Sequence, residues 1–154
     1  MRWLERHAWW GLLLIAVTLV IFGIVDMLSG AAADPAIARS LTGMSLAELE
    51  ASGPEAYRLF DFMTRVNGWS LVLAGSLAAA VLVFSFRKGS RWAWGVMWLL
   101  PAWALGVPVF YLVAGLQEGE PLPPPMISGP IVALLAVGVL VVSTGRFFRH
   151  EPGR

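Results

Sequence analysis

The sequence predicts an all-α membrane protein, a four-transmembrane-helix bundle with short helices in the first outer loop. Of the 154 residues, 58% are hydrophobic and only 14% are charged, which is too apolar for the surface of a small soluble domain. Four long stretches carry no charge and approach the 20 or so residues that a helix needs to cross the hydrocarbon core. Strand-like alternation is absent, so the stretches are helices rather than barrel strands.

The expected spans cover about residues 9–28, 68–86, 92–116 and 128–146 of a single membrane domain, 1–154. Before the first span stand Arg2 and Arg6, and after it Ala31-Ala32-Ala33, a pattern that also fits a secretory signal with its cleavage site. The uncharged run from Ala8 to Val25 is longer than the roughly 7 to 15 residues of a signal core. We therefore expect a retained helix.

The outer segment 45–66 is expected to fold as two short helices that rest on the outer mouth of the bundle. Ser45 and Glu48 form a capping box that starts the first, and Ser52-Gly53-Pro54 ends it and starts the second. Asn67-Gly68 is expected to bend the second helix into span two. The apolar face of the segment is too large to leave in water, and it comprises Leu46, Leu49, Leu59, Phe60, Met63 and Val66.

The remaining elements follow from small residues, prolines and a short turn. Small residues between Ala74 and Ala80 indicate close helix packing within the chain and place span two at the centre of the bundle. The short turn Arg87 to Arg91 predicts a tight hairpin of spans two and three. Pro101 and Pro108 are expected to kink span three, and Ser128-Gly129-Pro130 to start span four after a proline-stiffened loop.

The charges predict the orientation of the chain. Lysine and arginine in short loops mark the cytoplasmic side, and eight of the eleven fall on one side of the predicted spans: Arg2, Arg6, Arg87, Lys88, Arg91, Arg146, Arg149 and Arg154. Most acidic residues fall on the other: Asp34, Glu48, Glu50, Glu55, Asp61, Glu118 and Glu120. We expect a multi-pass protein of the plasma (inner) membrane with both termini cytoplasmic. Tryptophans at the cytoplasmic headgroups agree, namely Trp3, Trp9, Trp10, Trp92 and Trp94, with Trp69 opposite.

Polar residues that could form a site gather in the outer part of the chain. Asp26 is the ionisable residue at the end of a span, and we expect it to pair with Arg58 or Arg65, whereas Asp61 and Arg65 are one helical turn apart. The candidate ligand-binding residues are Asp26, Tyr57, Arg58, Asp61, Arg65, Asn67 and Tyr111. The chain has no cysteine, and His7 and His150 lack carboxylates at ligand spacing, so we expect no metal and no cofactor.

Two hypotheses for the function stay open. The first is a non-catalytic accessory or assembly component, or a lipid-associated bundle, because transport pathways and active sites in membranes need buried polar groups and few are present. The second is a membrane enzyme or carrier acting on a hydrophobic small molecule at the outer leaflet, with the seven candidates as its site. Expected partners are membrane lipids and other membrane subunits, and not nucleic acid.

A resemblance adds to this interpretation. The run Arg87-Lys88-Gly89-Ser90-Arg91-Trp92-Ala93-Trp94, followed by Trp98 and Pro101, resembles the second cytoplasmic turn of a group of uncharacterised bacterial four-helix membrane proteins. Gly43-Met44-Ser45, Glu48-Leu49, Pro54, Arg65 and Gly68 resemble their outer segment. The resemblance implies a four-helix bundle and no known activity. The layout is more distantly similar to DoxX-like proteins and to sterol-isomerase-like EXPERA bundles, whose intramembrane acidic residues are missing here.

Overall fold

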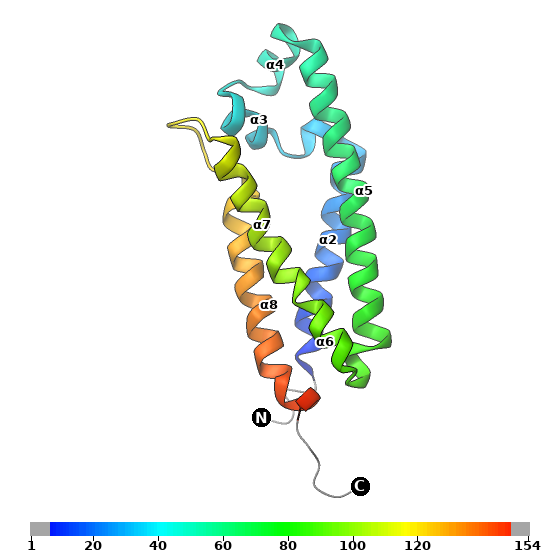
Figure 1. Cartoon of the computed structure of the whole chain (residues 1–154). Helices are drawn as coiled ribbons and strands as arrows, with labels where there is room; N and C mark the ends of the chain where they lie inside the picture. Colours follow the sequence, from blue (N-terminus) through cyan, green and yellow to red (C-terminus); the bar gives the residue numbers. More distant parts are fainter. Residues whose placement is uncertain (1–6, 149–154) are drawn as a thin grey trace, which may run out of the picture.

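The structure, a computed structural model that describes residues 7–148, is all-α, as the sequence predicts (Figure 1). Four segments are long and apolar enough to cross a membrane. Their long helices are α2 (Trp9–Ser29), α5 (Pro54–Phe84), α7 (Leu99–Ala114) and α8 (Pro124–Phe148). The shorter elements are η1 (Gly30–Ala33), α3 (Pro35–Thr42), α4 (Leu46–Ser52), η2 (Phe86–Lys88) and α6 (Arg91–Met97). Outside the described residues lie Arg2, Trp3, Arg6, Arg149, His150 and Arg154.

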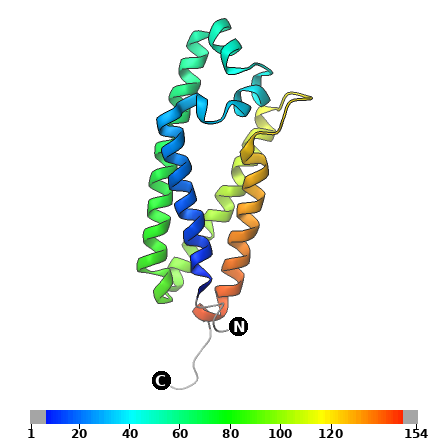
Figure 2. The ribbon, with the colours of Figure 1, turned by 180° about the vertical axis from the view of Figure 1, so that it is seen from behind.

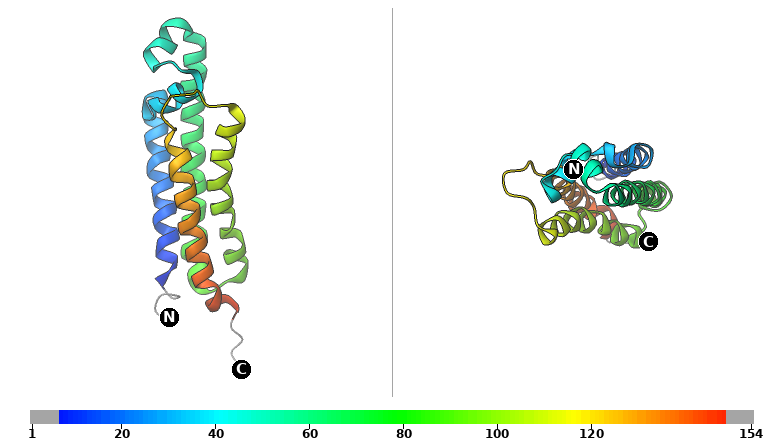
Figure 3. Two further views of the ribbon diagram at one scale, coloured as in Figure 1. Left: turned by 90° about the vertical axis from the view of Figure 1, so that its left-hand side faces the viewer. Right: turned by 90° about the horizontal axis from the view of Figure 1, so that it is seen from above.

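The long helices form two pairs rather than a bundle centred on α5. Helix α5 packs mainly on α2, and α7 packs mainly on α8, as the views from behind and from above show (Figures 2 and 3). The turn between α5 and α6 is short, as predicted, but α5 and α7 diverge from it and do not pack as a tight hairpin (Figure 1). The small residues of α5 therefore pack against α2.

The pairs meet at one end of the molecule, which we call the basic end because it holds Arg87, Lys88, Arg91 and Arg146. The main buried cluster lies there and draws on both pairs, with Leu12 from α2, Leu82 from α5 and Leu140 from α8, all fully buried. Toward the opposite end, which we call the far end, the two pairs move apart (Figure 1). Packing thus joins the pairs at the basic end and leaves the far end more open.

Two glycines bring α2 and α5 into backbone contact. A Cβ added at Gly68 would lie 2.5 Å from the carbonyl oxygen of Gly23 and 2.6 Å from the amide nitrogen of Met27. A Cβ at Gly23 would in turn lie 2.5 Å from the Gly68 carbonyl oxygen. Small residues at a helix crossing let the backbones approach this closely, so these two positions set the distance between the helices.

The bend predicted at Asn67-Gly68 is wrong, because α5 runs unbroken from Pro54 to Phe84. Glycine inside a helix costs about 1 kcal/mol relative to alanine, and at Gly68 the close contact with α2 compensates for this cost. The second outer helix is thus the first part of α5. It does not rest on the bundle mouth, since Leu59 and Met63 are 63% and 57% exposed.

Helix α4 confirms the predicted capping box. The Glu48 amide donates to the Ser45 hydroxyl (3.3 Å), and the Ser45 amide donates to the Glu48 carboxylate (2.8 Å). Leu49 is buried, and α4 packs against α5, which begins with Pro54 in its first turn, also as predicted. Local signals of this kind involve only residues that are close in the sequence, which explains why the sequence could predict them.

We expect the α4 cap to weaken in acid. The Ser45 hydroxyl and amide both donate to the Glu48 carboxylate and hold its pKa below the ordinary value. A carboxyl whose pKa is lowered by folding stabilises the folded state above the pKa of the unfolded chain, about 4.3, and this contribution is lost as the pH falls through the folded-state pKa. Amide exchange of Glu48 to Ser52, corrected for intrinsic rates, should lose protection toward pH 3. In Glu48→Gln the same amides should show no such pH dependence, and identical profiles would contradict this expectation.

Prolines shape the third and fourth spans in different ways. The third span is interrupted at Trp98, three residues before Pro101, whereas Pro108 is accommodated inside α7. A proline ring clashes with the carbonyl four residues before it and removes one hydrogen bond, which accounts for a break just after Met97. The predicted start of α8 at Ser128-Gly129-Pro130 is wrong. The helix already begins at Pro124, where a proline in the first turn needs no amide donor.

The tryptophans at the basic end divide into two groups. Trp10 and Trp92 are more than half exposed, in keeping with a place among lipid headgroups. Trp9 is 7% exposed and belongs to the core, and the indole N–H of Trp94 donates to the Leu140 carbonyl (3.1 Å). Two of the residues predicted as interfacial anchors therefore serve instead to hold helices together.

Candidate functional site

An ion pair on α5 holds the end of α2 at the far end of the molecule. Arg65 Nε lies 2.8 Å from Asp61 Oδ2, which confirms that these residues pair along one helical turn. Arg65 Nη1 also donates to the carbonyls of Met27 and Leu28, each at 2.9 Å, and Asp61 Oδ1 accepts from the Ala31 amide at 2.9 Å. The last carbonyls of a helix lack intrahelical donors and attract positive charge. We call this arrangement the Asp61–Arg65 clamp.

Gly30 allows the clamp to close. It ends α2 with φ of +58°, a conformation that residues with a Cβ rarely adopt. A Cβ at this position would also collide with the Asp61 carboxylate. The chain therefore turns from α2 into η1 directly against the clamp, and the Ala31 amide is presented to Asp61.

A second polar group lies on another side of α5 and involves Asp26. The Asn67 side-chain amide donates to the Asp26 carboxylate at 3.4 Å, a long hydrogen bond, and Asn67 remains exposed. Tyr111 of α7, also a candidate, is half-buried. The hydrogen bond joins α2 to α5, and we call Asp26, Asn67 and Tyr111 the Asp26 group.

The seven predicted residues do not gather at one point. Arg65 and Asn67 are two residues apart on α5 and so project about 160° apart around the helix. The pairing of Asp26 with Arg58 or Arg65 is wrong, because Arg65 is held by Asp61 and by backbone carbonyls. Within residues 7–148, Arg58 has no hydrogen bond or ion pair and is exposed, while Tyr57 is half-buried. The clamp and the Asp26 group are separate features.

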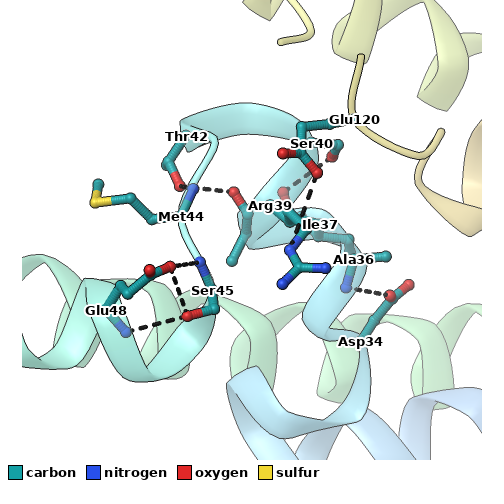
Figure 4. Close-up of polar contacts among 11 residues, drawn as sticks. Asp34, Ala36, Ile37, Arg39, Ser40, Thr42, Met44, Ser45, Glu48 and Glu120 are labelled. Atoms are coloured by element: carbon teal, nitrogen blue, oxygen red, sulfur yellow. Dashed lines mark hydrogen bonds and ion pairs between the residues drawn. The ribbon is translucent and has the colours of Figure 1, made fainter. Parts of the chain in front are cut away.

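Helix α3 contains polar residues that the sequence analysis did not select, and it bridges the two helix pairs. The Asp34 carboxylate accepts from the Ala36 amide (3.2 Å) at the start of α3. From the other end of this helix, the Ser40 carbonyl accepts from the Gln117 amide (2.8 Å). Arg39 also faces Glu120 at 3.9 Å (Figure 4). Asp34-Pro35 is a helix-start signal that could have revealed α3.

The environment of Asp34 disfavours its charge. Partial burial raises the pKa of this carboxyl above its ordinary value, and hydrogen bonds from the amides of Ala36 and Ile37 offset part of the effect. Because the charged form is less stable after folding, the Asp34 contribution to stability increases as the pH falls through its folded-state pKa. Asp34 is thus a helix cap rather than a freely solvated carboxylate.

In the part of the chain that the structure describes, no three histidine, aspartate or glutamate side chains come together as metal ligands. The two surface hollows of note are lined by other residues, one by Met44, Glu48, Ala51 and Ser52 and one at the basic end. Comparison with protein families, curated proteins and solved structures finds no match. The chemistry of the side chains therefore carries the functional argument alone.

Proposed function

We propose that this small integral membrane protein is a non-catalytic accessory or assembly component that works through contacts with lipids and other membrane subunits. The Asp61–Arg65 clamp carries the proposal. Arg65 and Asp61 direct their hydrogen bonds to Met27, Leu28, Ala31 and each other. Polar residues in a membrane are costly and commonly serve a function, and here they hold α2 against α5.

The exposed surface of the spans fits the same role. Large apolar side chains cover the outer faces of all four spans, and Phe110 on α7, for example, is 76% exposed. Such a surface is stable only against lipid or another apolar surface. With the basic end placed in the cytoplasm, as the positive charges favour, both partners would be met within the plasma membrane.

Crosslinking in native membranes tests the proposal. A photoreactive amino acid at Phe110 should give discrete crosslinked products with another membrane protein, whereas one at the buried Leu100 should not. The purified protein should show no turnover of membrane lipids. A protein that crosslinks only to lipid and that turns over any lipid as a purified monomer would overturn the proposal.

A carrier or enzyme for a hydrophobic small molecule is the second candidate, and the Asp26 group favours it. Asp26, Asn67 and Tyr111 offer a carboxylate, an amide and a phenol, and a hydrogen bond of 3.4 Å joins the first two. If this candidate holds, Asp26→Asn and Tyr111→Phe should each lower binding or turnover of the molecule at least tenfold. Arg58→Gln, at an exposed residue of α5, is the control. Equal effects of all three substitutions would exclude the Asp26 group as the site.

A further inference from the structure

Helix α3 connects the two helix pairs at the far end, opposite the core cluster that joins them at the basic end (Figure 1). It follows η1, where the Asp61–Arg65 clamp holds the Ala31 amide against α5. Its last turn contacts the loop 115–123, which joins α7 to α8. We propose that α3 is a strap that limits how far the two pairs separate at the far end. The proposal goes beyond an assembly role, because it assigns a conformational change to the chain alone.

Packing between α2 and α8 weakens toward the far end. Near the basic end the two helices touch, since a Cβ added at Gly11 would lie 3.0 Å from Val139 Cγ2. Phe22 lies about three helical turns further along α2 on the same face, yet it is 59% exposed. The close contact at Gly11 therefore does not extend to Phe22, and beyond this point the pairs depend on other contacts to stay together.

Gln117 supplies such contacts at the C-terminal end of α3. The last carbonyls of a helix lack intrahelical donors. The Gln117 main-chain amide donates to the Ser40 carbonyl (2.8 Å), and its side-chain amide donates to the Leu41 carbonyl (3.4 Å), although these segments are far apart in the sequence. Ala38 and Ser40 are 2% and 1% exposed. This end of α3 is therefore buried, and Gln117 of the other helix pair caps it.

The ion pair between Arg39 and Glu120 adds less to the strap. Arg39 Nε lies 3.9 Å from Glu120 Oε2, and the Arg39 side chain is 54% exposed. Solvent screens a pair of this kind, and salt weakens it further. The hydrogen bonds of Gln117 are less sensitive to salt. Their loss, rather than that of the ion pair, should release α3 from the loop.

A separation at the far end would leave the basic end in place. The core cluster at the basic end draws on both pairs and holds them together there. The third span is interrupted at Trp98, beside this cluster. Because α6 and α7 are separate helices, α7 can change direction there without the loss of a continuous helix. The ends of helices are the usual places where hinge movements are absorbed.

Distances between spin labels test the strap in the full chain, in lipid nanodiscs. The chain has no cysteine, so labels can be attached to introduced cysteines without removal of native ones. Leu28→Cys on α2 with Val113→Cys on α7 reports the far end, and both side chains are exposed. Leu14→Cys on α2 with Val141→Cys on α8 reports the basic end, again at exposed positions. Double electron–electron resonance would give a distance distribution for each pair of labels.

Gln117→Pro is the decisive variant, because it removes both the main-chain donor and the side-chain amide. We expect the far-end distribution to shift to longer distances and at least to double in width, while the basic-end distribution stays unchanged. Gln117→Ala keeps the main-chain amide and should widen the far-end distribution less. Glu120→Gln removes the ion pair alone and should have the smallest effect of the three.

Leu122→Pro is the matched control. Leu122 belongs to the same loop, is 53% exposed, and its amide makes no hydrogen bond with the described residues. We expect both distributions to stay unchanged in this variant. Equal widening in Gln117→Pro and Leu122→Pro would show a general effect of proline in the loop and overturn the strap. An unchanged far end in Gln117→Pro, or equal widening at both ends of the molecule, would overturn it as well.

Discussion

Gly68→Ala should separate α2 from α5 and destabilise the protein by about 1–3 kcal/mol, the range for inserting a methyl group into a filled space. The added Cβ would lie 2.5 Å from the Gly23 carbonyl oxygen and 2.6 Å from the Met27 amide nitrogen. Both neighbours are backbone atoms that cannot rotate away, so relief requires the helices to move apart. The gain in helix propensity, about 1 kcal/mol, would offset only part of the cost.

Gly138→Ala supplies the matched control. Gly138 lies within α8, and a Cβ there would meet nothing within 4 Å among the described residues. The same substitution should therefore raise stability by up to about 1 kcal/mol through helix propensity alone. Circular dichroism during thermal unfolding in one detergent would compare the two. If both variants shifted in the same direction by similar amounts, the close approach of α2 and α5 would be refuted.

Arg65→Ala should loosen the C-terminal end of α2 and lower the thermal stability of the protein, because the polar groups that Arg65 contacts lose their charged partner. It removes the donor of the Met27 and Leu28 carbonyls and the counter-ion of Asp61. The ion pair itself contributes little to stability, because solvent screens it, so the main effect is expected from the two carbonyls. Amide exchange of residues 29–33 should accelerate before global unfolding.

Arg58→Ala tests the specificity of this effect. It removes the same type of side chain from the same helix, at an exposed residue with no hydrogen bond or ion pair to residues 7–148. We expect a change within about 0.5 kcal/mol and unchanged exchange of residues 29–33. Comparable losses in both variants would mean that positive charge on α5 matters, and that the clamp does not.

The sequence was most informative where the physics is local. The number of spans follows from the lengths of the apolar stretches. The start of α4 follows from Ser45 and Glu48, whose side chains form hydrogen bonds with backbone amides only three residues away. The Asp61–Arg65 pair follows from helical spacing in the same way. None of these features depends on which helix packs against which.

Features that depend on helix pairing could not be predicted. Apolar side chains gain little by leaving lipid for another helix, so hydrophobicity does not reveal that α5 pairs with α2 and α7 with α8. Asn67-Gly68 predicted a turn, but the helix continues through these residues because Gly68 fits closely against Gly23 of α2. The separation of Arg65 from Asn67, in contrast, was available from their spacing alone.

The unbroken course of α5 has a mechanical consequence. At 31 residues the helix is about 46 Å long, whereas the hydrocarbon core is about 30 Å thick. The surplus, roughly 16 Å by the same rise per residue, would extend beyond the hydrocarbon core at the far end as a stiff arm, and α4 packs against α5. The tilt of a helix changes when the bilayer thins or thickens. Because α5 is continuous, its part outside the bilayer must tilt together with the part inside it. Changes in bilayer thickness would therefore be converted into lateral displacement of α4.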